Sequence, residues 1–169
     1  MRTFVAIFAA VAHLLLLDAA TKEFAVRCLR GAPAISVIPG FFDLAYVENR
    51  GCAWGMFQGQ VWPLAVFAAV VLAVLAWRRA DFFCTGGRGW RRIAGASAEC
   101  LLYAGIIGNL VDRVFRGHVV DLFDFHWGAA WHFPCFNVAD VCITAAAALL
   151  VVLSAAENRR DAGRNHDRA

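Results

Sequence analysis

Four apolar segments, each close to the length of a membrane-spanning helix, constrain this chain most. They cover residues 4–20, 61–77, 93–111 and 138–156. A helix needs roughly 20 apolar residues to cross the hydrocarbon core of a bilayer. Hydrophobic residues make up 61% of the chain and charged residues only 17%, fewer charges than an ordinary soluble domain carries. The sequence therefore predicts an all-α membrane protein with four transmembrane helices.

Basic residues between these segments predict how the chain is oriented. Arginines cluster in the loop between the second and third segments, and others lie at residue 2 and in the tail after residue 156. Because Lys and Arg are enriched in cytoplasmic loops, both termini are predicted to be cytoplasmic, with outer loops over residues 21–60 and 112–137. Short basic clusters argue against nucleic-acid binding. Without an internal repeat or linker, residues 1–169 are predicted to form one domain.

The two predicted outer loops differ in character. The first is rich in β-forming residues and is broken by Pro39 and Gly40, which predicts a few short strands resting on the outer leaflet. The second mixes acids, histidines and aromatic residues, including Trp127 and Trp131, which suit a membrane interface. The spacing of its histidines matches no zinc-binding pattern, so no metal site is predicted.

Two acids at the edges of the apolar segments need an explanation, because a charge inside a bilayer is costly. Asp140 lies just inside the fourth segment, and Asp121 follows two valines in the preceding loop. One interpretation is a pair of helix-terminal acids that never meet. The other is two carboxylates brought together, of which only one ionises readily. Such a pair can activate a water and protonate a leaving amine.

Other polar residues are predicted at the same ends of the segments. Asp18 and Lys22 can pair on one face of a helix as a structural contact. Asp112 and Arg113 are adjacent and point in different directions on a helix. Asp112 is therefore expected to accept structural hydrogen bonds, and Arg113 to reach backbone carbonyls of a ligand or loop.

Three asparagines lie next to a charge or a glycine. Asn49, Asn109 and Asn137 can each hold a peptide backbone or orient a carboxylate. Asn49 also suits a turn, and Asn137 also suits a helix cap. The six cysteines include no C-x-x-C pair and are expected to be mostly small apolar fillers, although Cys28 and Cys52 can pair on an oxidising side of the membrane.

Two other classes of function fit some of these features. A small transporter or channel uses intramembrane carboxylates to carry protons or cations, but a relay needs acids along its depth and only Glu99 lies deep in a predicted segment. A scaffold without chemistry uses polar residues to tie helices together. The transporter does not explain why three asparagines and an arginine gather with the acids at one surface, whereas the scaffold stays open as an alternative.

Five stretches, taken in order, resemble lipoprotein signal peptidase (signal peptidase II), a family of intramembrane aspartic peptidases. They are "DAATK" at 18–22, "NRGCAWG" at 49–55, "GIIGNLVDR" at 105–113, "GHVVDLFDF" at 117–125 and "FNVAD" at 136–140. The resemblance implies a four-helix bundle with a small extracytoplasmic β-cradle and a short amphipathic segment over the site. The implied catalytic residues are Asp121 and Asp140. The implied substrate-binding or dyad-supporting residues are Asn49, Gly51, Asn109, Arg113 and Asn137. The implied structural polar residues are Asp18, Lys22 and Asp112.

The resemblance also implies a substrate and a location. The substrate is a prolipoprotein whose lipobox cysteine carries a diacylglyceryl group, and the bond cleaved lies just before that cysteine. The family is inhibited by the cyclic peptide globomycin and uses no cofactor, metal or cysteine nucleophile. A monomer in the bacterial cytoplasmic (inner) membrane is expected, in contact with membrane lipid and with its active site at the outer face.

Overall fold

The computed structural model describes residues 2–83, 89–128 and 130–166 of the chain. Within these ranges four long helices correspond to the four apolar segments. They are α1 (Arg2–Cys28), α2 (Val61–Trp77), α4 (Trp90–Arg116) and α5 (Val138–His166), and a short helix α3 (Arg79–Phe82) follows α2. Arg88, Arg168 and Cys84, which belong to the predicted basic loop, basic tail and cysteine set, lie outside the described residues.

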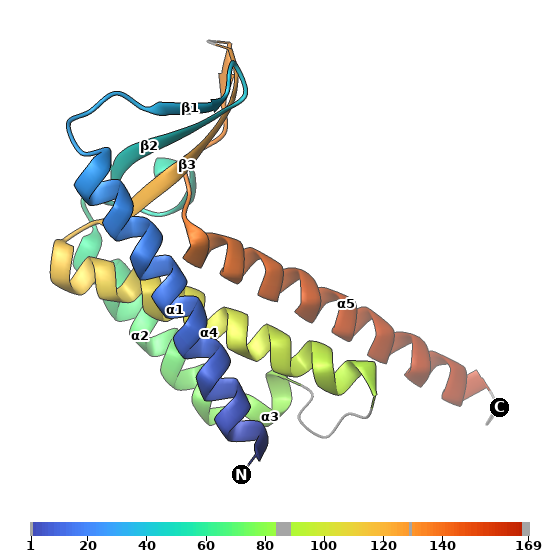
Figure 1. Ribbon diagram of the computed structural model, residues 1–169. Coiled ribbons are helices and arrows are strands. Elements are labelled where there is room, and N and C mark those ends of the chain that lie inside the picture. Colours follow the sequence, from blue (N-terminus) through green and yellow to red (C-terminus); the bar gives the residue numbers. More distant parts are fainter. Residues whose placement is uncertain (1, 84–88, 129, 167–169) are drawn as a thin grey trace.

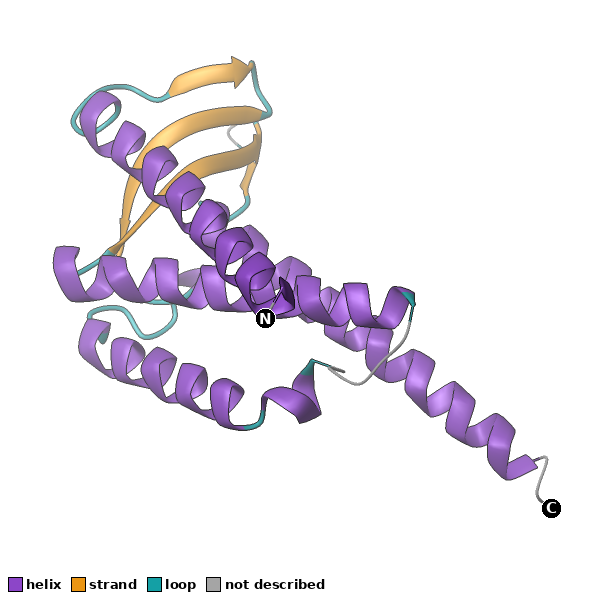
Figure 2. Cartoon of the chain, turned by 60° about the horizontal axis from the view of Figure 1, so that its bottom comes forward, coloured by secondary structure: helices purple, strands orange, loops and turns teal. Residues whose placement is uncertain are grey.

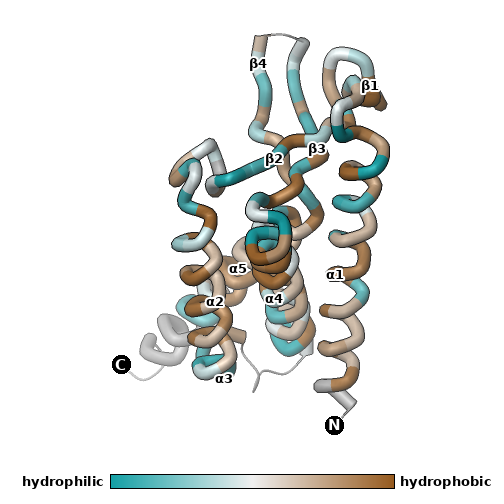
Figure 3. Tube along the Cα trace, turned by 90° about the vertical axis from the view of Figure 1, so that its left-hand side faces the viewer, coloured by the Kyte–Doolittle hydropathy of each residue, from teal (hydrophilic) through white to brown (hydrophobic). Residues whose placement is uncertain are grey.

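Three of the long helices, α1, α4 and α5, contain stretches long and apolar enough to cross a membrane. α2 is a shorter apolar helix of 17 residues, at the lower end of the length that a bilayer core requires. Figure 3 shows hydrophobic residues along most of α2, between hydrophilic residues at its two ends. The chain is therefore a membrane protein built on several apolar helices.

The ends of three helices differ from the prediction. α1 continues to Cys28 instead of ending at residue 20, α4 continues to Arg116 instead of ending at 111, and α5 continues to His166 instead of ending at 156. The predicted boundaries followed the last apolar residue, but an α-helix also accommodates polar residues that pair with one another. Glu23 of α1, for example, pairs with Arg116 of α4 at 3.1 Å. Gly117, in the left-handed conformation, then ends α4.

The segments between the long helices form one antiparallel sheet. Its strands are β1 (Ile35–Ile38), β2 (Phe42–Asn49), β3 (Val119–Trp127) and β4 (Trp131–His132), in the order β1-β2-β3-β4. Strands were predicted in the first segment, but β3 and β4 were not predicted in the second. Asp121 therefore lies on a strand and not on a loop. The acids and histidines of this second segment obscured a run that is rich in the β-formers Val and Phe.

The sheet lies at one end of the helices, away from the start of α1 and the far end of α5 (Figures 1 and 2). A buried apolar cluster joins it to the last turns of α1. The cluster consists of Ala25, Leu29, Val120 and Leu122. The pairing of β2 with β3 places Asn49 opposite Val119 and Val47 opposite Asp121. The end of α1, the two central strands and the start of α5 thus meet at one place.

Glycines allow α4 to approach α1 and α5 closely. A Cβ atom on Gly105 would lie 2.5 Å from the carbonyl oxygen of Ala139 in α5. A Cβ atom on Gly108 would lie 2.7 Å from Oδ2 of Asp18 in α1. Such small residues let helix backbones come together in membrane proteins. This close packing brings Asn109, the next residue along α4, to the start of α5.

Candidate functional site

Asp140 lies in the first turn of α5, which Asn137 caps. The N–H of Asp140 donates to Oδ1 of Asn137 at 3.0 Å, and the N–H of Asn137 donates to Oδ2 of Asp140 at 3.2 Å. This reciprocal arrangement is a capping box that satisfies two backbone donors at the helix start. It fixes the Asp140 carboxylate at the positive end of the helix dipole.

Asp121 is held by two asparagines. Its side chain is on β3, and the residue is only 1% exposed. Nδ2 of Asn49 donates to Oδ2 of Asp121 at 3.0 Å, and Nδ2 of Asn137 donates to Oδ1 at 2.7 Å. Asn49 and Asn137 come from β2 and the cap of α5, so the position of Asp121 depends on both elements.

Asn137 is the residue that the two carboxylates share. Its side-chain amide reaches Asp121 while its backbone N–H and Oδ1 bind Asp140. Burial, and secondly the negative charge of Asp140, raise the pKa of Asp121 to about 7, against hydrogen bonds from Asn49 and Asn137 that lower it. Near neutral pH the pair of acids can therefore hold one proton and one negative charge. An acid and a base side by side are what water activation requires.

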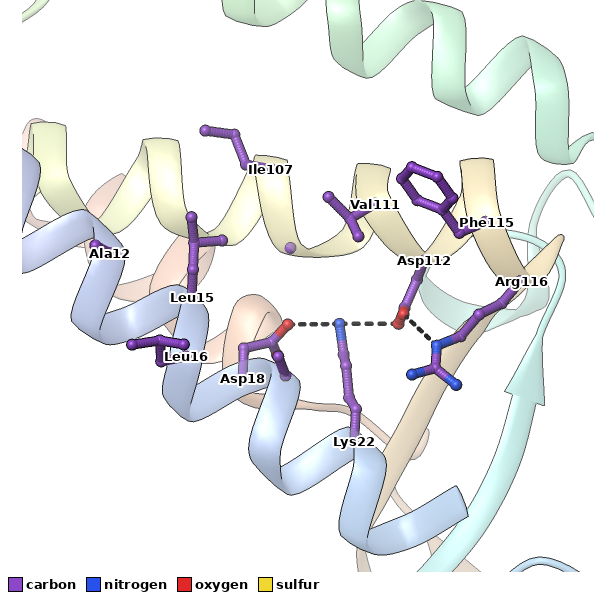
Figure 4. A pocket seen from close by; sticks show the side chains of 12 residues that line it. Ala12, Leu15, Leu16, Asp18, Lys22, Ile107, Val111, Asp112, Phe115 and Arg116 are labelled. Carbon is purple, nitrogen blue, oxygen red and sulfur yellow. Dashed lines mark ion pairs between the residues drawn. The ribbon is translucent and has the colours of Figure 1, made fainter. Parts of the chain in front are cut away.

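Asn109 connects the pair to a network of buried charges. Its Nδ2 donates to Oδ1 of Asp140 at 2.8 Å, and its Oδ1 accepts from Nζ of Lys22 at 3.0 Å. Lys22 also pairs with Asp18 at 2.8 Å and with Asp112 at 3.1 Å (Figure 4). The predicted pair of Asp18 and Lys22 therefore forms, within a larger network.

Asp112 and Arg113 make the separate contacts that their adjacent positions predicted. Oδ2 of Asp112 accepts the N–H of Val120 at 3.1 Å, which ties α4 to β3. Nη2 of Arg113 donates to the carbonyl oxygen of Gly51 at 3.0 Å. The N–H of Gly51 in turn donates to Oδ1 of Asn49 at 2.9 Å, so the predicted turn at Asn49 is present.

Position 51 has room only for a glycine. A Cβ atom at this position would lie 2.5 Å from the carbonyl oxygen of Met56, which is closer than any real contact. A side chain here would push the loop away from Arg113 and from the turn that orients Asn49. Gly51 therefore supports the pair of acids indirectly, because its loop sets the position of Asn49, which donates to Asp121.

Two contributions to the site were missed from the sequence. Oδ1 of Asp18 accepts the N–H of Ala139 at 2.9 Å, so α1 provides an additional cap for α5. Gly105 allows the approach of α4 to α5 on which the contact between Asn109 and Asp140 depends. The presence of two glycines, Gly105 and Gly108, within an apolar segment was a usable signal for close helix packing, whereas nothing in the sequence indicated a cap donated from another helix.

The cysteines and histidines form no further centre among the described residues. No disulfide joins Cys28 to Cys52 in the described part of the chain, so the pairing considered from the sequence is absent from this structure. Burial, aided by nearby Asp124, raises the pKa of Cys135 to about 12, so this thiol is neutral at physiological pH. Over the described ranges no three His, Cys, Asp or Glu side chains are arranged to hold a metal ion.

Comparisons with known proteins agree on one family. A family model described as signal peptidase (SPase) II matches residues 10–156. The chain is 37% identical to a lipoprotein signal peptidase of Clostridium acetobutylicum, over 82% of this chain and 86% of that protein. It is 39% identical to one of Syntrophotalea carbinolica, over 80% of this chain and 81% of that protein.

A solved structure adds a likeness of fold. It is that of a bacterial membrane enzyme, determined by the in meso method at 2.3 Å resolution. It superposes with a TM-score of 0.77 at 25% sequence identity, covering 90% of this chain and 89% of that one. The likeness therefore extends over the helices and the sheet together.

Proposed function

Because the chain belongs to the signal peptidase II family, we propose that Asp121 and Asp140 are the catalytic dyad with which it cleaves signal peptides from prolipoproteins. The observation that carries this proposal is the bridge through Asn137, which binds both carboxylates. Each acid also receives a hydrogen bond from a further amide, Asp121 from Asn49 and Asp140 from Asn109. The enzyme is thus an aspartic-type endopeptidase.

The chemistry follows from the different settings of the two acids. Asp140, at a helix N-terminus and bound by Asn109, acts as the base that takes a proton from water. Asp121, with its pKa raised to about 7, acts as the acid that protonates the carbonyl oxygen of the scissile bond. When the tetrahedral intermediate collapses, Asp140 gives the proton it took from water to the leaving amine, and Asp121 takes back the proton of the hydroxyl that becomes a carbonyl. No cofactor or metal takes part in this mechanism.

Arg113 and Asn49 are proposed to bind substrate as well as to support the dyad. The guanidinium of Arg113 donates to the carbonyl oxygen of Gly51, and this contact with a backbone carbonyl supports the proposed role. Gly51 follows the end of β2 at Asn49, and Asn109 and Asn137 hold the carboxylates. When an extended substrate binds, a carbonyl of its backbone can take the place of the Gly51 carbonyl that Arg113 now binds.

The substrate is proposed to carry a diacylglyceryl group on its lipobox cysteine, with the cut just before that cysteine. Acyl chains and an apolar signal helix both lie in the membrane, so a dyad at the end of the helices can meet the bond where it leaves the lipid. The site that Arg113 and the dyad form is also proposed to bind the cyclic peptide globomycin. The working unit is proposed to be a monomer surrounded by membrane lipid.

The arrangement in the membrane is part of the proposal. All four apolar helices cross the bacterial cytoplasmic membrane, including the shorter α2. Both termini are cytoplasmic, and the sheet forms a β-cradle at the outer face with an amphipathic segment over the site. Residues 1–169 act as one domain. The basic residues near the start of α4 and after α2 support this orientation.

The alternative, a proton- or cation-coupled transporter, has no support in the comparisons. Its key residue was Glu99, the acid deepest in a predicted segment. In the structure both oxygens of Glu99 accept hydrogen bonds from the guanidinium of Arg79. A carboxylate committed to an arginine in this way is poorly suited to pass a proton along the bundle.

The direct test is a cleavage assay on a prolipoprotein that already carries diacylglyceryl on its lipobox cysteine. The purified full-length protein should release the signal peptide, and globomycin should block the release. Parallel assays with the unmodified prolipoprotein test the need for the lipid. Failure of the full-length, folded protein to cleave the modified substrate would overturn the proposed function.

A further inference from the structure

Lys22 occupies the centre of the network behind the dyad, although it touches neither carboxylate of the dyad. It is 2% exposed, and its ammonium group has three partners. They are Oδ2 of Asp18 at 2.8 Å, Oδ2 of Asp112 at 3.1 Å and Oδ1 of Asn109 at 3.0 Å. Figure 4 shows Lys22 reaching from α1 between Asp18 and Asp112. An ammonium group has three N–H donors, so all of them are used.

The contact with Asn109 determines which way that amide points. A side-chain amide has a donor end and an acceptor end, and exchanging them reverses every contact. Oδ1 of Asn109 faces two donors, Nζ of Lys22 and Nδ2 of Asn137. A lysine ammonium offers no acceptor, so the flipped amide would set donors against donors. It would also turn its oxygen toward the carboxylate of Asp140, which now receives Nδ2.

We propose that Lys22 is a positioning residue for the reaction, which fixes the amide of Asn109 so that this amide orients Asp140, and whose charge favours the ionised base. This inference rests on the proposed function of the dyad. It goes further than the structural role expected of Lys22 from the sequence. Lys22 reaches Asp140 through Asn109, and Asp121 through Asn109 and Asn137.

Charged side chains from α1 and α4 surround the ammonium group of Lys22. Two anions, Asp18 and Asp112, balance its charge directly. Arg116 also pairs with Asp112, at 3.0 Å, so Asp112 has two cationic partners, Lys22 and Arg116. Glu23 pairs with Arg116 in turn, and the charged groups of the site, Asp121, Asp140 and Arg113, lie beyond. Removing the cation of Lys22 leaves a net excess of negative charge beside the dyad.

A purely structural role would be to hold α1 against α4. The neighbouring residue on α1 also makes such a contact, because Glu23 pairs with Arg116 of α4 at 3.1 Å. Glu23 makes no contact with either asparagine or with the dyad in the described part of the chain. The variant Glu23→Gln therefore weakens a tie between α1 and α4 without affecting Asn109, and serves as the matched control.

The experiment measures kcat, KM and the pH profile of full-length variants in lipid vesicles, with the diacylglyceryl-modified prolipoprotein as substrate. Lys22→Met removes the donor and the charge from a side chain of similar length. We expect kcat to fall about tenfold to 100-fold with KM changed less than about threefold, because positioning and not binding is lost. The profile should move to higher pH, since the carboxylates lose a stabilising cation. Glu23→Gln should retain both kcat and profile.

A double-variant cycle tests whether Lys22 acts through Asn109. Asn109→Ala removes the amide that Lys22 orients, so adding Lys22→Met should lower kcat by less than about threefold more. Losses that multiply would overturn the proposal. If Lys22→Met alone does not insert, the comparison is made in an Asp112→Asn background, which removes one of the two carboxylates that pair with Lys22 and so reduces the excess negative charge.

The outcomes separate this inference from the proposed function. If the unaltered protein does not cleave the modified prolipoprotein, the proposed function fails. If it cleaves, and Asp121→Asn does not, the function stands. In that case a Lys22→Met variant with unchanged kcat and pH profile overturns the role of Lys22 alone. A lower thermal midpoint with an unchanged pH profile would also overturn it, by showing a structural tie.

Discussion

Two regions of the molecule bury charged side chains, and they differ in how those charges are connected. Near the sheet, Asp18, Lys22 and Asp112 form a network that continues through asparagine amides to two further acids. Toward the other end of α4, Glu99 pairs with Arg79 of α3. Asp112 and Glu99 are similarly buried on the same helix, at 5% and 3% exposure. Burial of an acid therefore does not by itself identify a site.

The difference lies in the partners that surround each acid. The Arg79 guanidinium neutralises Glu99 and leaves it with no second carboxylate nearby among its described contacts. Within the described part of the chain Asp121 receives hydrogen bonds from two neutral amides, and burial, together with the charge of Asp140, raises its pKa to about 7. Charged partners fix a structural acid, whereas amides and a second acid leave a reactive one able to exchange its proton.

The largest effect should come from the dyad. Replacing either acid, as Asp121→Asn or Asp140→Asn, should lower cleavage of the modified prolipoprotein by at least about 10³-fold, because a proton acceptor or donor is lost. The matched change at the other region, Glu99→Gln, should retain kcat within about twofold. Insertion and elution as a folded species control for loss of structure. A fully active Asp121→Asn or Asp140→Asn enzyme would show that the dyad is wrong.

A smaller effect is expected at Asn137, which bridges the dyad. Asn137→Ser keeps a good helix cap but loses the amide donor to Asp121, so kcat should fall roughly tenfold to 100-fold with little loss of stability. Asn137→Ala loses the cap as well and should unfold more easily by about 1 kcal/mol. Activity assays and thermal unfolding in detergent measure the two properties. Equal kcat for Asn137→Ser and the unaltered protein would contradict the bridging role.

The pH dependence should reveal the raised pKa of Asp121. The protonated acid is the proton donor, and it is protonated below its pKa of about 7. Activity should therefore fall as pH rises above about 7, by about tenfold per pH unit at the limit, with the two acids titrating as a pair. The profile of kcat/KM measures this, and Glu99→Gln should give the same profile. Activity that is flat to pH 9 would contradict the assignment of Asp121 as the acid.

The smallest effect on catalysis is expected from the pair of Arg79 and Glu99. Arg79→Met leaves Glu99 without its counter-charge, and because the Arg79 side chain is 27% exposed the loss should lie between that of a surface and a buried pair. A decrease in the free energy of unfolding of about 2 kcal/mol is expected. The measurement is thermal or denaturant unfolding. Cleavage at a permissive temperature should be unchanged, and a lost or shifted pH profile would show that the two regions are coupled.

Much of the fold could be predicted because it depends on local patterns. Apolar runs located all four long helices, and Pro39 with Gly40 fell between β1 and β2 as turn residues should. Helix ends were predicted poorly, because Glu23 and Arg116 pair across helices and let each helix continue past its apolar run. β3 was missed since its acids face other elements, whose contacts no local pattern records.

The candidate site divides in the same way. Asp121, Asp140 and the three asparagines could be selected as unusual polar residues beside lipid, and their spacing resembled a known family. What the sequence could not indicate is that Asn137 binds both acids, or that Asp18 caps a helix 121 residues away. These contacts join residues that are distant along the chain, so they exist only once the helices have packed.

The sequence by itself determined the helices, their apolar character and the presence of two acids at the edges of the apolar segments, because hydrophobic length and the cost of buried charge are local quantities. Only the tertiary structure decided which acids face one another and which face a cation. Close packing at Gly105 and Gly108 brings α1, α4 and α5 together, and from there the direction of one amide, that of Asn109, relates Lys22 to Asp140. The reactivity of a carboxylate depends on distances of a few ångströms between its neighbours, and packing sets those distances.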